Sequence, residues 1–518
     1  MQGGQGKEFE PLSGVRLLFA TVSLALATLM IVLDTTIANV SIPAISGDLG
    51  VSTSQGTWVI TFFAVSNAIA VPLTGWLTMR IGQMKLFLWS ISLFILSSFL
   101  CGMSWNINML IGFRVMQGFV AGPMIPLSMS LLLQCYPRAK AGMAIALWSM
   151  TVTVAPIAGP ILGGWLTDNI SWPWIFYINI PIGALAAGIT WAVLRDREST
   201  IRKLPVDRVG MLMLFVWVGC LQIMLDKGKD LDWFSSPVII ALSVISAVVF
   251  CYFLVWELTA KHPIIDIKLF LDRNFSLSTI TLSLGYSIFF MNVVLMPLWL
   301  QRFMGYTATW AGLVTAPFGI FAIILSPVVG KSLSRVDPRL FVTGAFIFFS
   351  VAYFMRSGFS TAVDAKSIVV TMLIQGIGMA GFMTPLNAMA VSELPHEKIA
   401  SASGLINFAR IMLGGFGASI GTSMWEDRAA MHHAQLAEHI TPYTESANIA
   451  VHNMHSLGLA GGKPYGLINM EITKQSFMFS AAEIFWVSGV FFIVMISLVW
   501  LTKPKGHGAK PAPIPDGH

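Results

Sequence analysis

The sequence is poor in charged residues and in cysteine. Asp, Glu, Lys and Arg make up 11% of its 518 residues, whereas hydrophobic residues make up 55%. Soluble domains carry about 25% charged residues, so the composition excludes a soluble globular protein and indicates a polytopic membrane protein. The four cysteines, Cys101, Cys135, Cys220 and Cys251, lie within or at the ends of apolar runs. This placement argues against disulfides and predicts small apolar filler residues.

Catalytic and nucleotide-binding patterns are also missing. No Ser-His-Asp or metal-ligand spacing stands out, so an enzyme embedded in the membrane is disfavoured and no cofactor or metal is expected. Gly376 to Gly381 fits GxGxxG but lies inside an apolar run, and the glycines before Lys463 lack phosphate-loop spacing. The net charge of +6 comes from basic residues between apolar runs, which indicates membrane topology and not a nucleic-acid site.

Fourteen apolar runs are long enough to cross a bilayer as helices, because backbone polar groups in lipid must be satisfied internally. We therefore predict an all-α integral membrane protein. The runs are 16–39, 55–78, 84–103, 107–134, 141–167, 174–194, 208–226, 236–257, 275–298, 308–331, 339–357, 366–391, 399–422 and 480–502.

Lys and Arg predict the orientation of these spans. The segments on the side of the N-terminus hold most of the basic residues, including a cluster in 195–208. The opposite segments hold fewer, among them Arg356 and Arg428. The positive-inside rule then places both termini in the cytoplasm.

A weak internal repeat divides the chain. Pro72 to Gly75 recurs as Pro327 to Gly330, and Gln117-Gly118 recurs as Gln375-Gly376. Two similar halves are typical of secondary transporters, whose sites lie between them, and the repeat disfavours a sensor or channel. The predicted organisation is a tail 1–15, a six-helix half 16–194, a linker 195–207, two extra spans 208–257, a loop 258–274, a second six-helix half 275–502 and a tail 503–518.

Asp34 and Arg114 are charged residues inside spans. Asp34 lies about six residues inside the external end of the first span, and Arg114 about seven residues inside that of the fourth. A carboxylate within a span costs roughly 2.5–3.5 kcal/mol on insertion scales. Their similar depth allows a pair, or a shared water-filled cavity, that binds and releases a proton. A static buried ion pair, or an Asp that only bonds a neighbouring helix, remains the alternative.

Two further regions carry polar residues outside the expected pattern. Arg410 lies near the middle of the thirteenth span, where it could bind an anionic substrate or anchor helix-end carbonyls. The external segment 423–479 is long and contains His432 and His433. A metal site there is conceivable, but solvated histidines are the commoner case, and we predict a surface that contacts a partner protein.

Glycine and proline gather in the fifth span. Gly159 and Gly163 form a GxxxG face, next to Pro156, Pro160 and Gly164. Small residues allow close helix approach and prolines bend the helix. This segment is either a tightly packed hinge between conformations or ordinary membrane packing.

Several of these motifs resemble the major facilitator superfamily. Gly75, Arg80 and Gly82 match its motif between spans two and three, although Met79 replaces the usual acidic residue. Arg114, Gln117 and Gly118 resemble its proton-transfer motif. The glycines and prolines of the fifth span resemble its antiporter motif. Leu33 to Thr36, with Asn39, and Trp174 to Pro181 are similar to the fourteen-span drug:proton antiporter branch.

Longer stretches, such as Gln55 to Thr61 and Gly305 to Gly312, are similar to the EmrB-type family of inner-membrane efflux pumps, of which FarB-type fatty-acid exporters are close relatives. The resemblance implies proton-coupled multidrug efflux, with Asp34 and Arg114 in proton coupling. It also implies an EmrA-like periplasmic adaptor and a TolC-like outer-membrane channel. Export of long-chain fatty acids, or less readily proton-coupled import, is the alternative. Candidate residues of the substrate cavity are Asn39, Gln117, Gln375 and Arg410.

Overall fold

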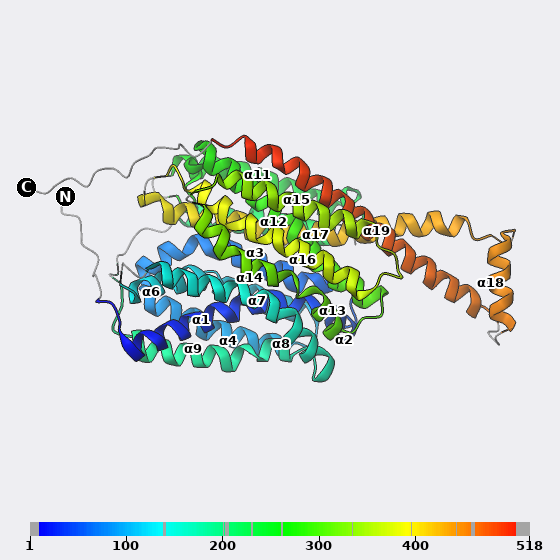
Figure 1. Cartoon of the computed structure of the whole chain (residues 1–518), viewed down its shortest axis with the longest axis horizontal. Coiled ribbons are helices and arrows are strands. Elements are labelled where there is room, and N and C mark those ends of the chain that lie inside the picture. Colours follow the sequence, from blue (N-terminus) through cyan, green and yellow to red (C-terminus); the bar gives the residue numbers. More distant parts are fainter. Residues whose placement is uncertain are drawn as a thin grey trace, which may run out of the picture.

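The structure, a computed structural model, is an elongated bundle of helices with a narrower projection at one end (Figure 1). It describes residues 10–137, 141–199, 201, 207–228, 231–260, 263–333, 335–394, 396–441, 443–456 and 461–503. Within these ranges there is no β-strand. Twelve stretches of the described chain are helical, long and apolar enough to cross a membrane.

These twelve stretches correspond closely to predicted spans. Their helices are α1 Gly14–Ile37, α3 Thr53–Ile81, α4 Gln83–Gly102, α5 Ile107–Ala121 with α6 Met124–Cys135, α8 Trp174–Tyr177 with α9 Asn179–Leu194, α10 Arg208–Lys227, α11 Pro237–Thr259, α12 Arg273–Phe303, α13 Ala308–Thr315 with α14 Phe318–Ser332, α15 Pro338–Ser357, α16 Ala365–Ala390 and α19 Lys463–Trp500. Two further helices, α7 Ala141–Asn169 and α17 His396–Glu438, contain the other two predicted segments. The total of fourteen spans remains a prediction.

Proline explains two interruptions among these helices. The break between α5 and α6 falls at Gly122-Pro123, and that between α13 and α14 falls at Ala316-Pro317. Proline lacks an amide hydrogen and its ring clashes with the preceding turn, so it bends or ends a helix. Each interrupted pair still follows one path through the bundle.

The packing pattern occurs twice along the chain. In the first half α3 packs on α5, and α4 packs on α5 and α9. In the second half α14 packs on α16, and α15 packs on α16 and α19. The two sets meet where α3 contacts α17 and where α7 contacts α13 and α14. Between them in sequence, α10 contacts α3 and α17, and α11 packs on α10.

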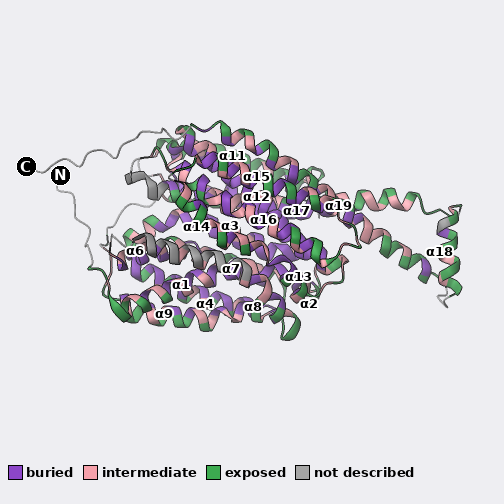
Figure 2. Cartoon of the chain, viewed as in Figure 1, coloured by how far each residue is buried: buried purple, intermediate pink, exposed green. Residues whose placement is uncertain are grey.

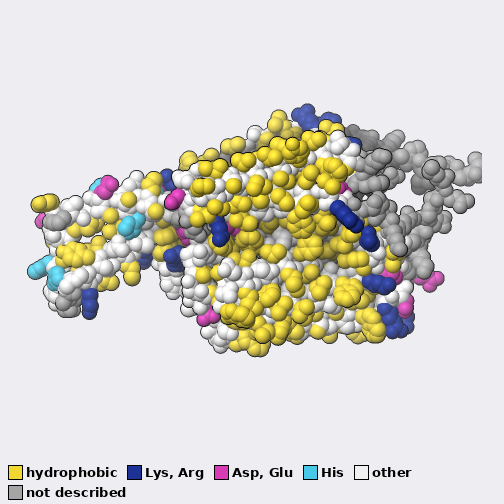
Figure 3. All heavy atoms as spheres, turned by 180° about the vertical axis from the view of Figure 1, so that it is seen from behind, with side chains coloured by type: hydrophobic (Ala, Val, Ile, Leu, Met, Phe, Trp, Pro, Cys, Tyr) yellow, Lys and Arg dark blue, Asp and Glu magenta, His cyan; other side chains and the backbone are white. Residues whose placement is uncertain are grey.

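The outer face of the bundle is apolar. Figure 3 shows hydrophobic side chains over most of the visible bundle surface, and Figure 2 shows buried residues along the inner faces of the helices. Helix α11 is the extreme case, because only 17% of the residues in its most hydrophobic stretch are buried. An exposed apolar surface of this extent matches lipid and not water.

The segment predicted to be external, residues 423–479, is largely helical where the structure describes it. Helices α17 and α19 continue beyond the bundle, and α18 Glu445–Ser456 lies across their far ends (Figure 1). The 43 residues of α17 extend roughly 65 Å at 1.5 Å per residue, well beyond a hydrocarbon core of about 30 Å. We call this projection, residues 423–479, the hairpin, and the bundle end that bears it the hairpin end.

Arg356 lies in a different environment from the one expected. The charge count places it in an external segment, whereas its side chain is 1% exposed within the last turn of α15. Its guanidinium donates to Gln375 Oε1 and to Thr371 Oγ1. The count of charges was misleading here because this residue ends a helix while its side chain turns into the protein.

Candidate functional site

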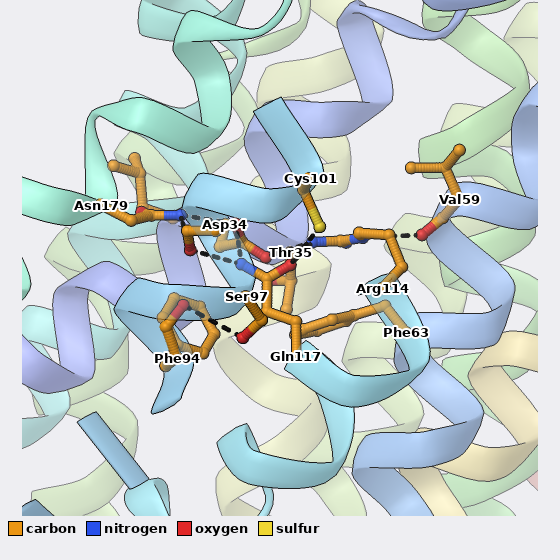
Figure 4. A network of polar contacts seen from close by, with 12 residues as sticks. Asp34, Thr35, Val59, Phe63, Phe94, Ser97, Cys101, Arg114, Gln117 and Asn179 are labelled. Carbon is orange, nitrogen blue, oxygen red and sulfur yellow. Dashed lines mark hydrogen bonds and ion pairs between the residues drawn. The ribbon is translucent and has the colours of Figure 1, made fainter. Parts of the chain in front are cut away.

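Asp34 and Arg114 form a buried ion pair between α1 and α5. Arg114 Nη1 lies 2.6 Å from Asp34 Oδ2, and the side chains are 1% and 0% exposed (Figure 4). Arg114 Nε also donates to the backbone carbonyl of Val59 on α3, at 2.9 Å. The sequence prediction that the two charges could pair is therefore correct in geometry. Their role in proton coupling remains a prediction.

Amide side chains complete the shell of the carboxylate. Asn179 Nδ2 donates to Asp34 Oδ1 at 2.7 Å, and Gln117 Nε2 donates to the same oxygen at 3.3 Å. Arg114 Nη1 donates to Gln117 Oε1 at 2.7 Å. Ser98 Oγ accepts from both amides, at 2.7 Å and 3.3 Å. The network thus joins α1, α4, α5 and α9.

Aromatic rings enclose this network. The guanidinium carbon of Arg114 lies 4.1 Å from the ring centroid of Phe63 and 5.4 Å from that of Phe176. Such contacts stabilise a cation, more so when it is desolvated. The negative charge of the carboxylate is thus met inside the protein by one guanidinium and two neutral donors.

Sequence reasoning missed Ser98 and Asn179 as members of the site. Asn179 is distinguished only as part of the stretch Trp174 to Pro181, and Ser98 lies in a predicted span without a motif that singles it out. An asparagine in the first position of α9, after the short helix α8, was the available signal. Which helix face it occupies is decided by packing against α1 and α4.

The four residues predicted to line a substrate cavity have different surroundings. Gln117 belongs to the ion-pair network, and Gln375 Nε2 contacts the Tyr353 hydroxyl at 3.4 Å while its oxygen accepts from Arg356. Asn39 is buried in the short 3₁₀ helix η1 Ala38–Val40. The structure does not bring these three residues together.

Arg410 has contacts that neither sequence hypothesis foresaw. Its Nη2 donates to Asn407 Oδ1 at 3.0 Å, and its guanidinium carbon lies 4.8 Å from the ring centroid of Tyr286. The side chain is half-buried. Within the described residues it contacts a side-chain amide and an aromatic ring and not helix-end carbonyls.

The glycines of α7 lie against α1 on one side and against α13 on the other. A Cβ on Gly159 would meet Thr36 Oγ1 at 2.1 Å, and one on Gly163 would meet the Ile37 carbonyl at 2.5 Å. On the other side, a Cβ on Gly164 would lie 2.4 Å from the Ala308 carbonyl of α13. Helix α7 therefore fits between α1, close to Asp34, and the second half.

Pro160 takes part in the same close approach. A Cβ on Gly312 of α13 would lie 2.2 Å from the Pro160 carbonyl. Pro156 lies in α7 at a position whose side chain is outside the described part of the structure. The two halves are also joined at the hairpin end by Asp168 Oδ2, which accepts from the Thr309 amide at 2.7 Å.

The motif between α3 and α4 is completed by a residue far along the chain. Gly82 has a φ of +96°, a conformation that favours glycine. Glu198 accepts hydrogen bonds from the backbone amides of Met84 and Lys85, both at 3.1 Å. Glu198 thereby places a carboxylate at the N-terminus of α4. The motif itself lacks its usual acidic residue, because that position is Met79.

The other two residues of this motif make fewer contacts. The guanidinium carbon of Arg80 lies 5.3 Å from the ring centroid of Trp76. Gly75 is exposed, and an added Cβ there would meet open space.

The histidines named as partner contacts are held by residues of α19, which for His432 lies just beyond the hairpin. His432 Nε2 lies 3.0 Å from Glu483 Oε1, and His433 Nε2 lies 3.0 Å from Asn469 Oδ1. Arg428 forms a two-pronged contact with the same Glu483, at 2.6 Å and 2.7 Å. Among the described residues no group of three His, Cys, Asp or Glu side chains could hold a metal ion.

Comparisons with known proteins agree on one family. A model described as Major Facilitator Superfamily matches residues 24–419. Multidrug export protein EmrB of Escherichia coli K12 is 50% identical over 496 residues, which cover 96% of this chain and 97% of that protein. Fatty acid resistance protein FarB of Neisseria gonorrhoeae is 47% identical over 500 residues, covering 96% of this chain and 99% of that protein.

Solved structures agree on the fold. A bacterial homologue of the human lysosomal transporter Spinster, in an inward-facing and unoccupied conformation, superposes with a TM-score of 0.61 at 14% identity. The match covers 95% of this chain and 99% of that one. At this identity the likeness concerns the fold alone.

Proposed function

Because the chain belongs to the Major Facilitator Superfamily, a family of secondary transporters and not of enzymes, we propose that it is a proton-driven exporter of hydrophobic toxic compounds. The observation that carries the proposal is the buried pair of Asp34 and Arg114. The two relatives are a multidrug export protein and a fatty acid resistance protein, and these activities support export as the direction.

Asp34 is the proposed proton carrier. Charged Asp34 accepts from Arg114, Asn179 and Gln117, so its negative charge is fully compensated in the arrangement seen here. Protonation removes that charge and weakens the pair with Arg114. In the proposed cycle Asp34 takes a proton in the outward-open state and releases it to the cytoplasm in the inward-open state. Each inward charge supplies about 2.3 kcal/mol per 100 mV.

Two contacts connect this pair to the interface between the halves. Arg114 holds the Val59 carbonyl of α3, and α3 packs on α17 of the second half. Gly159 of α7 lies against Thr36, two residues after Asp34, and α7 packs on α13. A change of charge at Asp34 therefore acts on α3 and α7, two helices of the first half that pack against the second half. This physical connection supports coupling between the proton and rocking of the halves.

The finer topology and the partners belong to the same proposal. Fourteen spans with both termini in the cytoplasm place the hairpin in the periplasm of a Gram-negative cell. Pumps of the kind this chain resembles pass their substrates to an EmrA-like adaptor and a TolC-like channel. The hairpin is the proposed adaptor contact, because α17 and α19 extend from the bundle and carry it well beyond the membrane. Protons are the proposed coupling ion, and no cofactor is required.

Transport in reconstituted vesicles tests this function. The wild-type protein and Asp34→Asn are reconstituted, and efflux of a fluorescent hydrophobic cation is followed with and without an imposed pH gradient. Wild-type efflux is expected to depend on the gradient and to be accompanied by proton flux. Asp34→Asn is expected to lose both, because an amide cannot take up the proton.

The controls separate the parts of the proposal. Asp196→Asn is the matched substitution, because Asp196 is 92% exposed and far from the site in the fold. A fluorescent fatty acid in the same assay shows whether long-chain anions are preferred to cations. Full gradient-driven efflux by Asp34→Asn would contradict the assignment of the proton carrier. Uptake instead of efflux under the physiological gradient would contradict export.

A further inference from the structure

A second buried carboxylate lies on the seam between the two halves. Asp226 is 8% exposed in the last turn of α10. Its Oδ2 accepts from Gln222 Nε2 at 2.8 Å and from Thr61 Oγ1 of α3 at 3.2 Å. Gln222 Nε2 also donates to Ser419 Oγ of α17 at 2.8 Å. One small polar cluster therefore joins an extra helix to both halves, since α3 and α17 belong to different halves.

Asp226 differs from Asp34 in having no cationic partner. The ion pairs of the described residues do not include it. The neighbouring Lys227 points elsewhere, with its Nζ 5.5 Å from the ring centroid of Trp58. The charged form of a buried carboxylate without a counter-ion is unfavourable. The partial negative charge at the C-terminal end of a helix disfavours that charged form further.

The cluster also contains an acceptor that lacks a donor. Gln222 Oε1 is buried, and no donor among the described residues reaches it. Buried polar atoms are normally hydrogen-bonded. A proton on Asp226 would turn its carboxyl group from an acceptor into a donor next to this amide. Gln222 Oε1 lacks a donor, and Asp226 lacks a cationic partner among the described residues. These are separate observations, and each is explained by a proton on Asp226.

From these observations we propose that Asp226, with Gln222, Thr61 and Ser419, is a second proton-binding site that holds the hairpin end of the transporter closed. When α3 and α17 are in contact, the carboxyl group is shielded from water and is stable in its neutral form. When they separate at this end, water reaches it and the charged form becomes favourable. Protonation therefore stabilises closure, and loss of the proton stabilises opening.

The site would regulate the gate and would not deliver the transported proton. Asp226 lies at the end of α10 next to the exposed Lys227, so it exchanges with the external side only. It is nevertheless linked to Asp34 through one helix, because Arg114 binds Val59 and Asp226 binds Thr61, both on α3. The inference rests on the alternating access and the topology of the proposed function.

Other charged groups are distant along the three helices of the cluster. Helix α3 has no Asp, Glu, Lys or Arg between its start and Arg80. Helix α17 has none between Arg410 and Glu426, and α10 has only Asp226 between its terminal residues Arg208 and Lys227. Glu257, on the adjacent α11, lies near the opposite end of that helix and accepts from the Ile265 amide. The pH response of the seam is therefore assigned to Asp226.

A distance measurement across the gate tests the proposal. Spin labels are placed at Ser52 and Ala430, two exposed positions that line the same hollow at the hairpin end. The protein is in lipid nanodiscs, without its four native cysteines, and carries Asp34→Asn in every arm so that the first proton site is silent. His433 and Glu426, which are titratable and line the same hollow, are both replaced by Gln in every arm. Double electron–electron resonance then gives the distance between the two labels at a series of pH values from about 5 to 9.

We expect the short distance to dominate at low pH and a longer population to grow as the pH rises. Asp226→Asn mimics the protonated form and should keep the short distance throughout. Thr61→Val retains the carboxyl group but removes one donor to its charged form, so the midpoint of opening should move to higher pH. This variant decides the question if Asp226→Asn does not fold.

Two results would overturn the proposal. One is a label distance that does not change with pH while Asp226 is present, which would make the cluster a static hydrogen-bonded joint. The other is the same pH response with Asp226→Asn or an unchanged midpoint with Thr61→Val. Failure of the proposed function would be visible separately, as efflux that ignores the proton gradient in proteins with an intact Asp34.

Discussion

Arg114 reaches across from α5 to bind Asp34 on α1 at 2.6 Å, although 80 positions separate the two residues in the chain. The same guanidinium holds the carbonyl of Val59 on α3. One side chain thus ties three helices of the first half together at the candidate proton site. Any change in the charge of Asp34 must alter this joint.

Breaking one partner of the pair should destabilise the protein. Arg114→Met leaves a buried carboxylate with only the amides of Asn179 and Gln117, which we expect to cost about 3–5 kcal/mol. The melting temperature in detergent should fall accordingly. The double variant Arg114→Met with Asp34→Asn removes both charges and should recover much of the loss. Equal instability of the single and double variants would show that the charge of Asp34 is not what the guanidinium stabilises.

Closure at the hairpin end should be sensitive to one methyl group. Gly312→Ala places a Cβ 2.2 Å from the Pro160 carbonyl, and Gly164→Ala places one 2.4 Å from the Ala308 carbonyl. Both are backbone atoms that cannot turn aside, so α7 and α13 must separate. We expect a longer distance between labels on the two halves and slower efflux.

Gly188→Ala is the matched control for that prediction. Gly188 lies within α9, and no atom would lie within 4 Å of an added Cβ. Its label distance and efflux should match the wild type. A Gly312→Ala protein that closes normally would contradict the tight contact between α7 and α13.

The N-terminus of α4 should depend on Glu198. Glu198→Ala removes the acceptor for the amides of Met84 and Lys85, and loss of such a cap costs about 0.5–2 kcal/mol. Hydrogen exchange of these amides should become faster, while the exposed Asp196→Asn should leave it unchanged. Gly82→Ala should be worse, because its φ of +96° and the adjacent Glu198 carboxylate both oppose a side chain. Unchanged exchange in both variants would rule out this cap.

The hairpin should be dispensable for transport by the pump alone. Replacing residues 434–472 by a short flexible linker leaves the Arg428 and Glu483 contact and the whole bundle in place. Efflux from vesicles should persist, because the proton site and the interface between the halves are intact. In cells that also contain the adaptor and the outer channel, resistance should be lost. Loss of vesicle efflux in a folded truncated protein would show that the hairpin serves the bundle itself.

Most of the helix positions could be predicted from the sequence. A bilayer requires long apolar helices, so the apolar runs alone located α4, α10 and α11 to within a few residues. The same argument failed at 423–479, because apolarity marks only the part of α17 and α19 inside lipid. It also failed for Arg356, whose position after an apolar run indicates the helix end but not the direction of the side chain.

Composition and spacing along the chain were enough to predict that the protein spans the membrane, that Asp34 and Arg114 lie at similar depth, and that α7 can approach its neighbours closely. These properties follow from local composition and spacing. The folded arrangement was needed to show that Ser98 and Asn179 complete the site, that Glu198 caps α4 and that Asp226 lies between the halves. Each of these contacts joins residues far apart in the chain. In lipid there is little hydrophobic driving force for helices to associate. Close packing and polar contacts therefore select which helices meet, and neither can be predicted from the sequence of one helix.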